Sequence, residues 1–369
     1  MLSKAMVFTA VGQPLELREF PVTYPGPGGM WVKVAMSTIC GSDLHTTLGT
    51  RPAPVPIILG HEITGSVAAL GKGVTTDTMG RPLKEGDRIT WTIFANCGNC
   101  YFCKIKSLPM KCLKLFKYGH ECCTPAPHLN GGYAEYCYII PGTFVFKIPD
   151  SISDEEITPA NCGLATIMQG CDEIKINPED HVVIQGAGLL GIYAAAVAKE
   201  RGAGKVIIID MVPERLEMAK RFGADVAVNS RGLRDEDLIA SIMDQTEGWG
   251  ADVVLELAGT PKVLPVGLKM LRKGGRYSWQ GNVFPNATFP CDAYDIITRW
   301  ITIRGFHNYD ALQLAEAVAF IERTKDKYPF RDLVGCKLPL ADLARGLKIA
   351  EERKAVRAAI CPGLPATHD

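Results

Sequence analysis

Residues 181–191 read HVVIQGAGLLG, an apolar run that ends in three glycines with the spacing G-x-G-x-x-G. The alanine-rich segment 192–200, typical of a helix, comes next, and a second apolar run follows at 205–210. A strand, a glycine turn, a helix and a second strand are the repeating parts of a parallel doubly wound sheet. Apolar runs at 251–259 and 274–281, separated by helical segments, extend the pattern. The sequence therefore predicts an α/β protein with such a sheet.

The glycine turn has the context of a dinucleotide-binding site. Glycine lets the backbone turn tightly and approach a pyrophosphate at the N-terminus of the following helix. The residues expected to bind it are Gly186, Gly188, Leu189, Leu190 and Gly191. The alternative is a tight structural turn with no ligand.

Asp210, at the end of the second apolar run, bears on the choice of dinucleotide. A carboxylate there accepts hydrogen bonds from the adenosine ribose hydroxyls and repels a 2′-phosphate, and Met211 offers no cation to receive one. We therefore expect NAD rather than NADP. Arg215 lies close enough in sequence to be part of the cofactor site and to complicate that choice.

The rest of the chain has a different pattern. Up to about residue 160, short apolar runs alternate with clusters of turn residues, which is typical of a β-rich domain. After about residue 308 the sequence predicts two amphipathic helices, at 311–325 and 340–354, and a final strand at 355–361. A chain of 369 residues is long enough for two domains.

Composition narrows the possible functions. The 40 basic and 40 acidic residues balance, so no net charge attracts the chain to nucleic acid or to an anionic membrane. Residues 1–20 mix charged and apolar residues, unlike a secretory signal peptide. We find no apolar segment of membrane-spanning length. We therefore expect a cytoplasmic protein without a nucleic-acid or membrane partner.

Thirteen cysteines are many for a cytosolic chain, where clustered thiols indicate a metal rather than disulfides. Four of them form a loop: Cys97, Cys100, Cys103 and Cys112. Three cysteines at strict three-residue intervals plus a nearby fourth thiol predict a closed tetrahedral zinc site of structural type. A nucleic-acid-binding zinc ribbon is the competing class, but no basic stripe with interleaved aromatic residues accompanies the loop. An iron–sulfur cluster is the other alternative.

His61 and Glu62, in GHEITGSVAALGKGV (residues 60–74), are adjacent and lie among glycines. Alone, the pair indicates either one metal ligand with a carboxylate beside it or two polar residues entering a strand. With ICGSDLH (39–45), the cysteine loop and the glycine turn, the chain resembles the zinc-dependent medium-chain dehydrogenase family, the alcohol dehydrogenase superfamily. The resemblance covers nearly the whole chain.

The resemblance implies a GroES-like β-rich catalytic domain over residues 1–165 and 308–369, interrupted by a Rossmann NAD-binding domain over 166–307. It implies that Cys40, His61 and Cys162 hold a catalytic zinc. Two thiolates and an imidazole leave a fourth position for water or an alkoxide.

The resemblance also assigns roles around this zinc. Glu62 would lie directly behind the metal or bind it intermittently, and Asp43 would orient His61. Ser42 would take the proton of the substrate hydroxyl and pass it through the cofactor ribose to His45.

Two further residues resemble cofactor contacts of the family. Thr166 would contact the nicotinamide and Arg357 the pyrophosphate. The alternative for Arg357 is an ordinary surface arginine.

Together these features predict a zinc-dependent alcohol dehydrogenase that exchanges hydride between an alcohol and NAD, carries two zinc ions and forms a homodimer or homotetramer. The alternatives are a polyol dehydrogenase of the same family and a zinc-stabilised binding protein without turnover. A zinc-free quinone reductase is disfavoured because it lacks the cysteine loop. Residues 80–88 and 117–121 also resemble dehydrogenases of phosphonate catabolism.

Other features do not identify a function. Residues 73–88 form a longer link than is usual in the family, and the Cys103–Cys112 interval is one residue longer. The aromatic residues Trp91, Phe94 and Tyr118 indicate either a wall of the substrate pocket or plain core. A second group of potential ligands follows the loop: His120, Cys122, Cys123 and His128. We do not expect these to bind a third metal, because the two zinc sites are complete without them.

Overall fold

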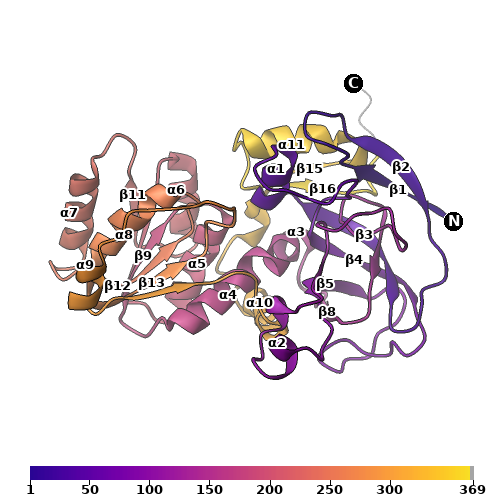
Figure 1. Cartoon of the computed structure of the whole chain (residues 1–369), viewed down its shortest axis with the longest axis horizontal. Coiled ribbons are helices and arrows are strands. Elements are labelled where there is room, and N and C mark those ends of the chain that lie inside the picture. Colours follow the sequence, from indigo (N-terminus) through magenta and orange to yellow (C-terminus); the bar gives the residue numbers. More distant parts are fainter. Residues whose placement is uncertain (366–369) are drawn as a thin grey trace. The chain divides into compact units, whose positions relative to one another are not determined.

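The computed structural model describes residues 1–365, and the chain forms two compact units (Figure 1). One unit comprises Met1–Ala165 with the C-terminal segment that begins at Asp310, and the other comprises Thr166–Tyr309. Among residues 1–365, none of the helices has both the length and the hydropathy that crossing a membrane requires.

The unit formed by Thr166–Tyr309 contains a six-stranded sheet in which all strands are parallel. Its strands are β9 (His181–Gln185), β10 (Lys205–Asp210), β11 (Val226–Asn229), β12 (Ala251–Glu256), β13 (Leu271–Trp279) and β14 (Thr302–Gly305). Their spatial order, β11-β10-β9-β12-β13-β14, is 3-2-1-4-5-6 when they are counted along the chain. That is the order of the dinucleotide-binding doubly wound fold, so the predicted sheet is confirmed.

Helices connect these strands, as parallel pairing requires. They are α5 (Leu189–Glu200), α6 (Pro213–Arg221), α7 (Asp235–Gln245), α8 (Leu264–Met270) and α9 (Ala293–Thr298). The strand order reverses between β9 and β12, which are neighbours in the sheet. In open α/β sheets, ligands bind at the carboxyl ends of the strands beside such a reversal. The glycine turn follows β9 directly and therefore lies at this point.

The other unit is built on an eight-stranded sheet with the order β15-β16-β3-β4-β5-β6, to which β7 adds beside β3 and β8 beside β5. These strands are β3 (Met30–Thr38), β4 (Glu62–Leu70), β5 (Arg88–Ala95), β6 (Phe116–Lys117), β7 (Tyr136–Ile139), β8 (Thr143–Lys147), β15 (Val334–Leu338) and β16 (Arg357–Ile360). A separate antiparallel pair consists of β1 (Leu2–Val7) and β2 (Glu16–Pro21). The helices of this unit are α1 (Gly41–Thr47), α2 (Tyr101–Lys104), α3 (Asp154–Ile157), α10 (Ala311–Thr324) and α11 (Leu343–Glu351), and α4 (Gly163–Ile174) begins in it.

The register of this sheet brings distant segments together. Thr38, at the end of β3, pairs with Glu62 at the start of β4 and with Ala359 of β16. Figure 1 shows the yellow C-terminal strands beside the purple strands from the start of the chain. The segments that follow β3, precede β4 and begin β16 therefore meet at one place in the sheet.

The three aromatic residues considered for the pocket belong to the core. Trp91, Phe94 and Tyr118 are all completely buried, and Trp91 and Tyr118 pack edge-to-face with their ring centroids 6.2 Å apart. Their side chains thus fill the interior between strands instead of forming an exposed pocket wall.

The long link at residues 73–88 contains a small hairpin closed by a bridge between Thr76 and Pro82. The buried Asp77 carboxylate accepts hydrogen bonds from the backbone N–H groups of Met79 (3.0 Å) and Arg81 (2.9 Å). It also accepts from Arg81 Nε (2.7 Å) and from the backbone N–H of Lys147 in β8 (3.1 Å). One carboxylate therefore holds the additional residues against the sheet.

Candidate functional site

Four side chains of metal-ligand type, from three separate segments, meet in the first unit. They are Cys40, His61, Glu62 and Cys162, and their ligand atoms all lie within 4.8 Å of one another. Cys40 is the N-cap of α1, His61 directly precedes β4, and Cys162 lies between a 3₁₀ turn and α4. Two thiolates and an imidazole at these separations fit a zinc ion with an open coordination position.

The buried Asp43 side chain fixes Cys40 and His61 relative to each other. Its Oδ2 accepts the backbone N–H of Cys40 (2.8 Å), which caps α1, and the hydroxyl of Tyr133 (3.2 Å). Its Oδ1 accepts the backbone N–H of Gly60 (3.2 Å) and lies 3.6 Å from His61 Nδ1. Because Nδ1 faces this carboxylate, Nε2 is the imidazole atom left for a metal.

Asn161, which the sequence analysis did not identify, positions Cys162. Its buried side-chain amide donates to the carbonyl oxygens of His61 (3.4 Å), Ile63 (3.4 Å) and Trp91 (3.3 Å). The residue before Cys162 is thereby tied to β4 and β5. The signal in the sequence was the polar Asn161 directly before Cys162 in TPANCG (158–163), which could have indicated a residue that supports the site.

Glu62 is held by a buried ion pair. Its two carboxylate oxygens accept from Nε and Nη2 of Arg357, each at 2.9 Å, and Thr38 Oγ1 donates at 2.5 Å. Nη2 of Arg357 also lies 3.7 Å from Cys40 Sγ. The structure thus directs the Arg357 guanidinium toward Glu62, and its contact with a pyrophosphate stays a prediction.

The site carries strong electrostatic coupling. A hydrogen bond from Cys162 lowers the pKa of Cys40 well below its ordinary value, against burial and with help from Arg357 and His61. Burial alone lowers the pKa of His61, but the charges of Asp43 and Cys40 outweigh it and raise the pKa to about 10. Burial raises the pKa of Glu62 to about 7, although Arg357 opposes the rise. Cys40 therefore favours its thiolate form beside positive charge, and a bound metal cation would supply such a charge.

The two expected proton carriers lie on one helix. Ser42 Oγ is 3.4 Å from His61 Nε2, and His45 follows three residues later in α1. His45 Nδ1 is 2.9 Å from Thr50 Oγ1. Residues three apart share a helix face. Their roles in proton transfer stay predictions.

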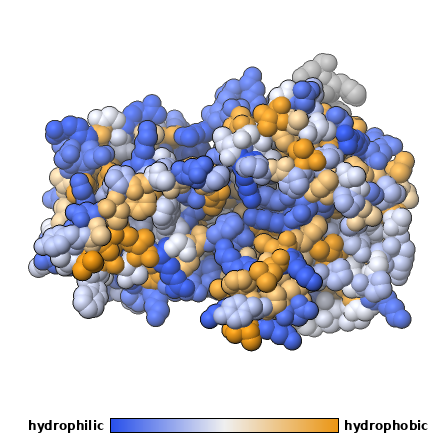
Figure 2. Space-filling model, viewed as in Figure 1, coloured by the Kyte–Doolittle hydropathy of each residue, from blue (hydrophilic) through white to orange (hydrophobic). Residues whose placement is uncertain are grey.

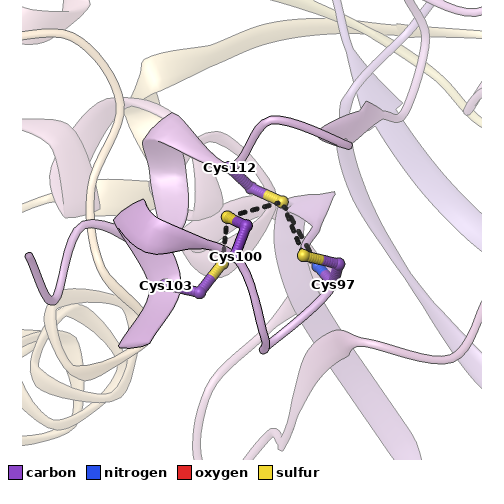
Figure 3. A group of neighbouring side chains, drawn as sticks. All are labelled: Cys97, Cys100, Cys103 and Cys112. Carbon is purple, nitrogen blue, oxygen red and sulfur yellow. Dashed lines mark hydrogen bonds between the residues drawn. The ribbon is translucent and has the colours of Figure 1, made fainter. Parts of the chain in front are cut away.

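The four loop cysteines converge on one point (Figure 3). Sulfur–sulfur distances are 3.4 Å for Cys97–Cys112, 3.5 Å for Cys100–Cys103 and 3.9 Å for Cys100–Cys112. Four sulfurs at about 2.3 Å from one tetrahedral zinc would lie about 3.8 Å apart. The backbone N–H of Leu113 lowers the pKa of Cys100 to about 6. The arrangement fits a structural zinc.

Packing alone gives this loop little support. Helix α2 buries none of its residues, and Ile105, Leu108 and Leu113 are exposed. Figure 2 shows hydrophobic residues gathered on the surface over this part of the chain. Met110 and Cys112 are the buried residues of this loop, so its own packing is small, and thiolate coordination of zinc supplies another source of stability.

The neighbouring potential ligands make other contacts. His120 Nδ1 lies 2.8 Å from the carbonyl oxygen of Tyr118, and His128 Nδ1 lies 3.0 Å from that of Cys123. Since a carbonyl oxygen only accepts, Nδ1 carries the proton in both rings.

In the second unit, the three glycines of the turn differ in their surroundings. Gly186 has a positive φ of 103°, and a Cβ on it would lie 2.8 Å from the backbone of Ala258. A Cβ on Gly191 would lie 1.8 Å from the carbonyl oxygen of Gly186, whereas Gly188 has no atom within 4 Å of its Cβ position. Gly188 caps α5, whose first residues are Leu189 and Leu190. The first N–H groups of a helix have no partner within it, so they suit a phosphate.

The Asp210 carboxylate is bound to the same turn. Its Oδ2 accepts the backbone N–H of Ala187 (2.7 Å), and its Oδ1 accepts those of Met211 (2.7 Å) and Val212 (2.9 Å). Arg231 Nε donates to the carbonyl oxygen of Met211 (3.1 Å). Arg231 follows β11 and Asp210 ends β10, so their proximity is not apparent from the sequence.

The remaining expected cofactor contacts lie on helices. Arg215 belongs to α6, and Thr166 is half-buried in α4, four residues after Cys162. Their contacts with a cofactor stay predictions.

Comparison with known proteins agrees with this geometry. The family model "Alcohol dehydrogenase GroES-like domain" matches residues 26–150, and "Zinc-binding dehydrogenase" matches residues 190–323. The chain is 32% identical over 346 residues to 5-exo-hydroxycamphor dehydrogenase of Pseudomonas putida, covering 91% of this chain and 92% of that one.

It is 35% identical over 285 residues to L-threonine 3-dehydrogenase of Pyrococcus horikoshii, covering 75% of each. The crystal structure of an alcohol dehydrogenase from Thermotoga maritima superimposes with a TM-score of 0.93 at 33% identity, covering 98% of this chain and 99% of that one. The chain belongs to the zinc-dependent medium-chain alcohol dehydrogenase family. The predicted GroES-like and Rossmann architecture is confirmed.

Membership of this family makes the protein an oxidoreductase of CH–OH groups that uses a nicotinamide dinucleotide. The structure contributes two candidate zinc sites, the four-cysteine loop and the cluster around His61.

Proposed function

We propose that the protein oxidises an alcohol to an aldehyde or ketone, reversibly and with NAD, at a catalytic zinc held by Cys40, His61 and Cys162. The observation that carries the proposal is the convergence of these three side chains, with Glu62, within 4.8 Å. The choice of a cysteine at position 162 agrees with an alcohol dehydrogenase rather than a polyol dehydrogenase. When bound, zinc lowers the pKa of the alcohol and NAD accepts its hydride.

The chain's own residues prepare this reaction. Asp43 faces Nδ1 of His61 and so keeps Nε2 directed at the site. Ser42, whose hydroxyl lies beside Nε2, takes the proton of the substrate hydroxyl. His45, one turn further along α1, exchanges that proton with solvent.

A panel of primary, cyclic secondary and phosphonate-bearing alcohols, assayed by NADH absorbance with zinc-loaded protein, tests the proposed reaction. We expect NAD reduction that disappears on zinc removal by a chelator and returns on adding zinc. Activity that survives complete removal of zinc would contradict it. The resemblance to dehydrogenases of phosphonate catabolism, the cytoplasmic location and assembly as a dimer or tetramer stay predictions.

The expected preference for NAD over NADP rests on Asp210. The nearby Arg231 would have the opposite effect if it bound the 2′-phosphate of NADP. Asp210→Gly removes charge-assisted hydrogen bonds worth about 1.5–3 kcal/mol each at most, so we expect a raised KM for NAD. It also removes the repulsion of the NADP 2′-phosphate, so the ratio of kcat/KM for NAD to that for NADP should decrease. Wild-type protein that already prefers NADP would overturn the assignment. Arg231→Met would then show whether Arg231 binds the 2′-phosphate.

A further inference from the structure

A buried carboxylate lies at the carboxyl end of the parallel sheet and has no part in the proposed reaction. Glu256 is the last residue of β12 and is fully buried. In the sheet it pairs with Gln185, the last residue of β9, and with Trp279, the last residue of β13. The strand order reverses between β9 and β12. Glu256 therefore lies where a doubly wound sheet binds its ligand.

The side chain of Glu256 connects the two segments that follow β12 and β13. Its Oε1 accepts the backbone N–H of Gly259, in the segment after β12, at 2.8 Å. Its Oε2 accepts the backbone N–H of Gly281 at 2.9 Å and Nδ2 of Asn282 at 3.2 Å, both in the segment after β13. One carboxylate thus fixes the positions of the two segments relative to each other.

The segment after β12 contacts both the glycine turn and the segment after β13. A Cβ on Gly186, the first glycine of the turn, would lie 2.8 Å from the backbone of Ala258. A Cβ on Gly281 would lie 2.6 Å from the backbone nitrogen of Gly259 and 2.7 Å from Glu256 Oε1. Three segments at the carboxyl ends of neighbouring strands are therefore in close contact around Glu256.

The buried charge of Glu256 depends on these segments. Burying a carboxylate costs free energy unless hydrogen-bond donors replace the lost water. Burial raises the pKa of Glu256, and the N–H groups of Gly259 and Gly281 oppose the rise. Because both carboxylate oxygens accept, a glutamine of the same shape would place its NH₂ group against the donors of one segment. Only a carboxylate satisfies both segments at once.

The position of Glu256 relates it to one half of the dinucleotide. A doubly wound sheet has two mononucleotide-binding halves, which share a dinucleotide across the reversal of strand order. Asp210 ends β10, so the half formed by β9, β10 and β11 is the one expected to take the adenosine. The half formed by β12, β13 and β14 then takes the nicotinamide ribose.

We propose that Glu256 is a positioning residue for the cofactor, which holds the segments after β12 and β13 in the arrangement that binds the nicotinamide half of NAD. The inference rests on the proposed use of NAD. It assigns to Glu256 no contact with the cofactor itself, because its oxygens are engaged by the two segments.

The affinities of zinc-loaded Glu256→Gln for NADH and for AMP test this role. AMP occupies the adenosine half alone, whereas NADH occupies both halves. We expect Glu256→Gln to bind NADH about tenfold more weakly than the wild type, because one segment loses its acceptor, and to bind AMP with unchanged affinity. The control Glu236→Gln removes an exposed carboxylate from α7 and should bind both ligands like the wild type. Fluorescence titration measures NADH binding, and calorimetry measures AMP binding.

A second variant disturbs the same contact from the other segment. Gly281→Ala keeps the carboxylate and places a Cβ against Gly259 and Glu256, so it should show the same selective loss of NADH affinity. The carbonyl oxygen of Glu256 accepts the backbone N–H groups of Gln280 (3.2 Å) and Gly281 (3.0 Å), and these bonds remain in Glu256→Gln. If Glu256→Gln nevertheless does not fold, the NADH and AMP affinities of Gly281→Ala decide.

Two results would overturn the inference. Equal losses of NADH and AMP affinity would show that the whole unit is loosened, without selectivity for the nicotinamide half. Unchanged NADH affinity together with a lower unfolding temperature would show that the side chain only stabilises the fold. A wild type that prefers NADPH would contradict the choice of NAD and leave the inference intact, and NADPH and 2′,5′-ADP would then replace NADH and AMP in the same comparison.

Discussion

Arg357 and Glu62, 295 positions apart in the chain, form a buried ion pair with two hydrogen bonds of 2.9 Å. The pair joins the first residue of β16 to the first residue of β4. Glu62 adjoins His61, so the C-terminal segment directly supports the candidate catalytic site. The ion pair also engages both carboxylate oxygens that could otherwise reach the metal.

Arg357→Met should destabilise the protein by about 3–5 kcal/mol, because it leaves the Glu62 charge buried without its partner. Urea unfolding of the zinc-loaded protein measures the effect, and Arg345→Met, which removes an exposed arginine from α11, is the control. Arg357→Lys should recover part of the loss. Equal unfolding midpoints for Arg357→Met and Arg345→Met would show that the pair adds no stability.

Two glycines of the dinucleotide turn should respond differently to alanine. Gly188 has space for a Cβ and a φ of −70°, so Gly188→Ala should fold normally. It should lose NAD affinity, because the added Cβ stands where the protein backbone must approach the pyrophosphate closely. Gly191→Ala places a Cβ against the Gly186 carbonyl, and overpacking of this kind costs about 1–3 kcal/mol. Thermal unfolding without cofactor and NAD titration by fluorescence separate the two effects. Normal NAD affinity in a stable Gly188→Ala would place the pyrophosphate elsewhere.

The long link at residues 73–88 predicts a dependence of stability on pH. Burial opposes ionisation of Asp77, but hydrogen bonds from Lys147 and Arg81 outweigh it and lower its pKa. A carboxyl group whose pKa is lower in the folded state stabilises the fold above its unfolded value, near 3.9, and loses this contribution as the pH falls through the folded value.

Asp77→Asn should therefore cost about 1–3 kcal/mol at pH 7. The difference from the wild type should shrink as the pH is lowered below about 4. Unfolding curves from pH 7 to pH 3 measure it, with Asp150→Asn, at an exposed position, as the control. A difference that stays constant across this range would show that the charge of Asp77 does not contribute.

The proton path predicts a specific phenotype for His45→Ala. Loss of a proton-transfer group costs roughly 10²–10⁴-fold, but water can bypass the outermost member of a relay, so we expect the low end or less. Alcohol oxidation should be slowed most near neutral pH, recover at high pH and respond to added imidazole. A pH profile of kcat that overlays the wild type, while Ser42→Ala remains impaired, would remove His45 from the path.

The sequence predicted the sites whose residues lie close together along the chain. The glycine turn and the four-cysteine loop each lie within a few tens of residues, and their backbone requirements are visible in the residue types. Contacts between distant segments were not visible. The hydrogen bonds of Asn161 reach 98 and 100 residues back along the chain, and the partner of Arg357 depends on the pairing of β16 with β3.

Two short strands and the location of three aromatic residues could not be predicted from the sequence either. The strands β11 and β14 are only four residues long, too short to be recognised alone, and neighbouring strands pair with them. Trp91, Phe94 and Tyr118 have the composition of a pocket wall and of a core alike, and only the strand register decides between the two.

The zinc content of Cys162→Ala tests the central claim most directly. Wild-type protein should hold two zinc ions per chain, one for each candidate site. Cys100→Ser should lose the structural ion together with stability, since coordination holds that loop folded. Cys162→Ala should keep its fold and one zinc ion and lose NAD-dependent alcohol oxidation. If Cys162→Ala instead retains two zinc ions and full activity, the catalytic metal is not held by Cys40, His61 and Cys162.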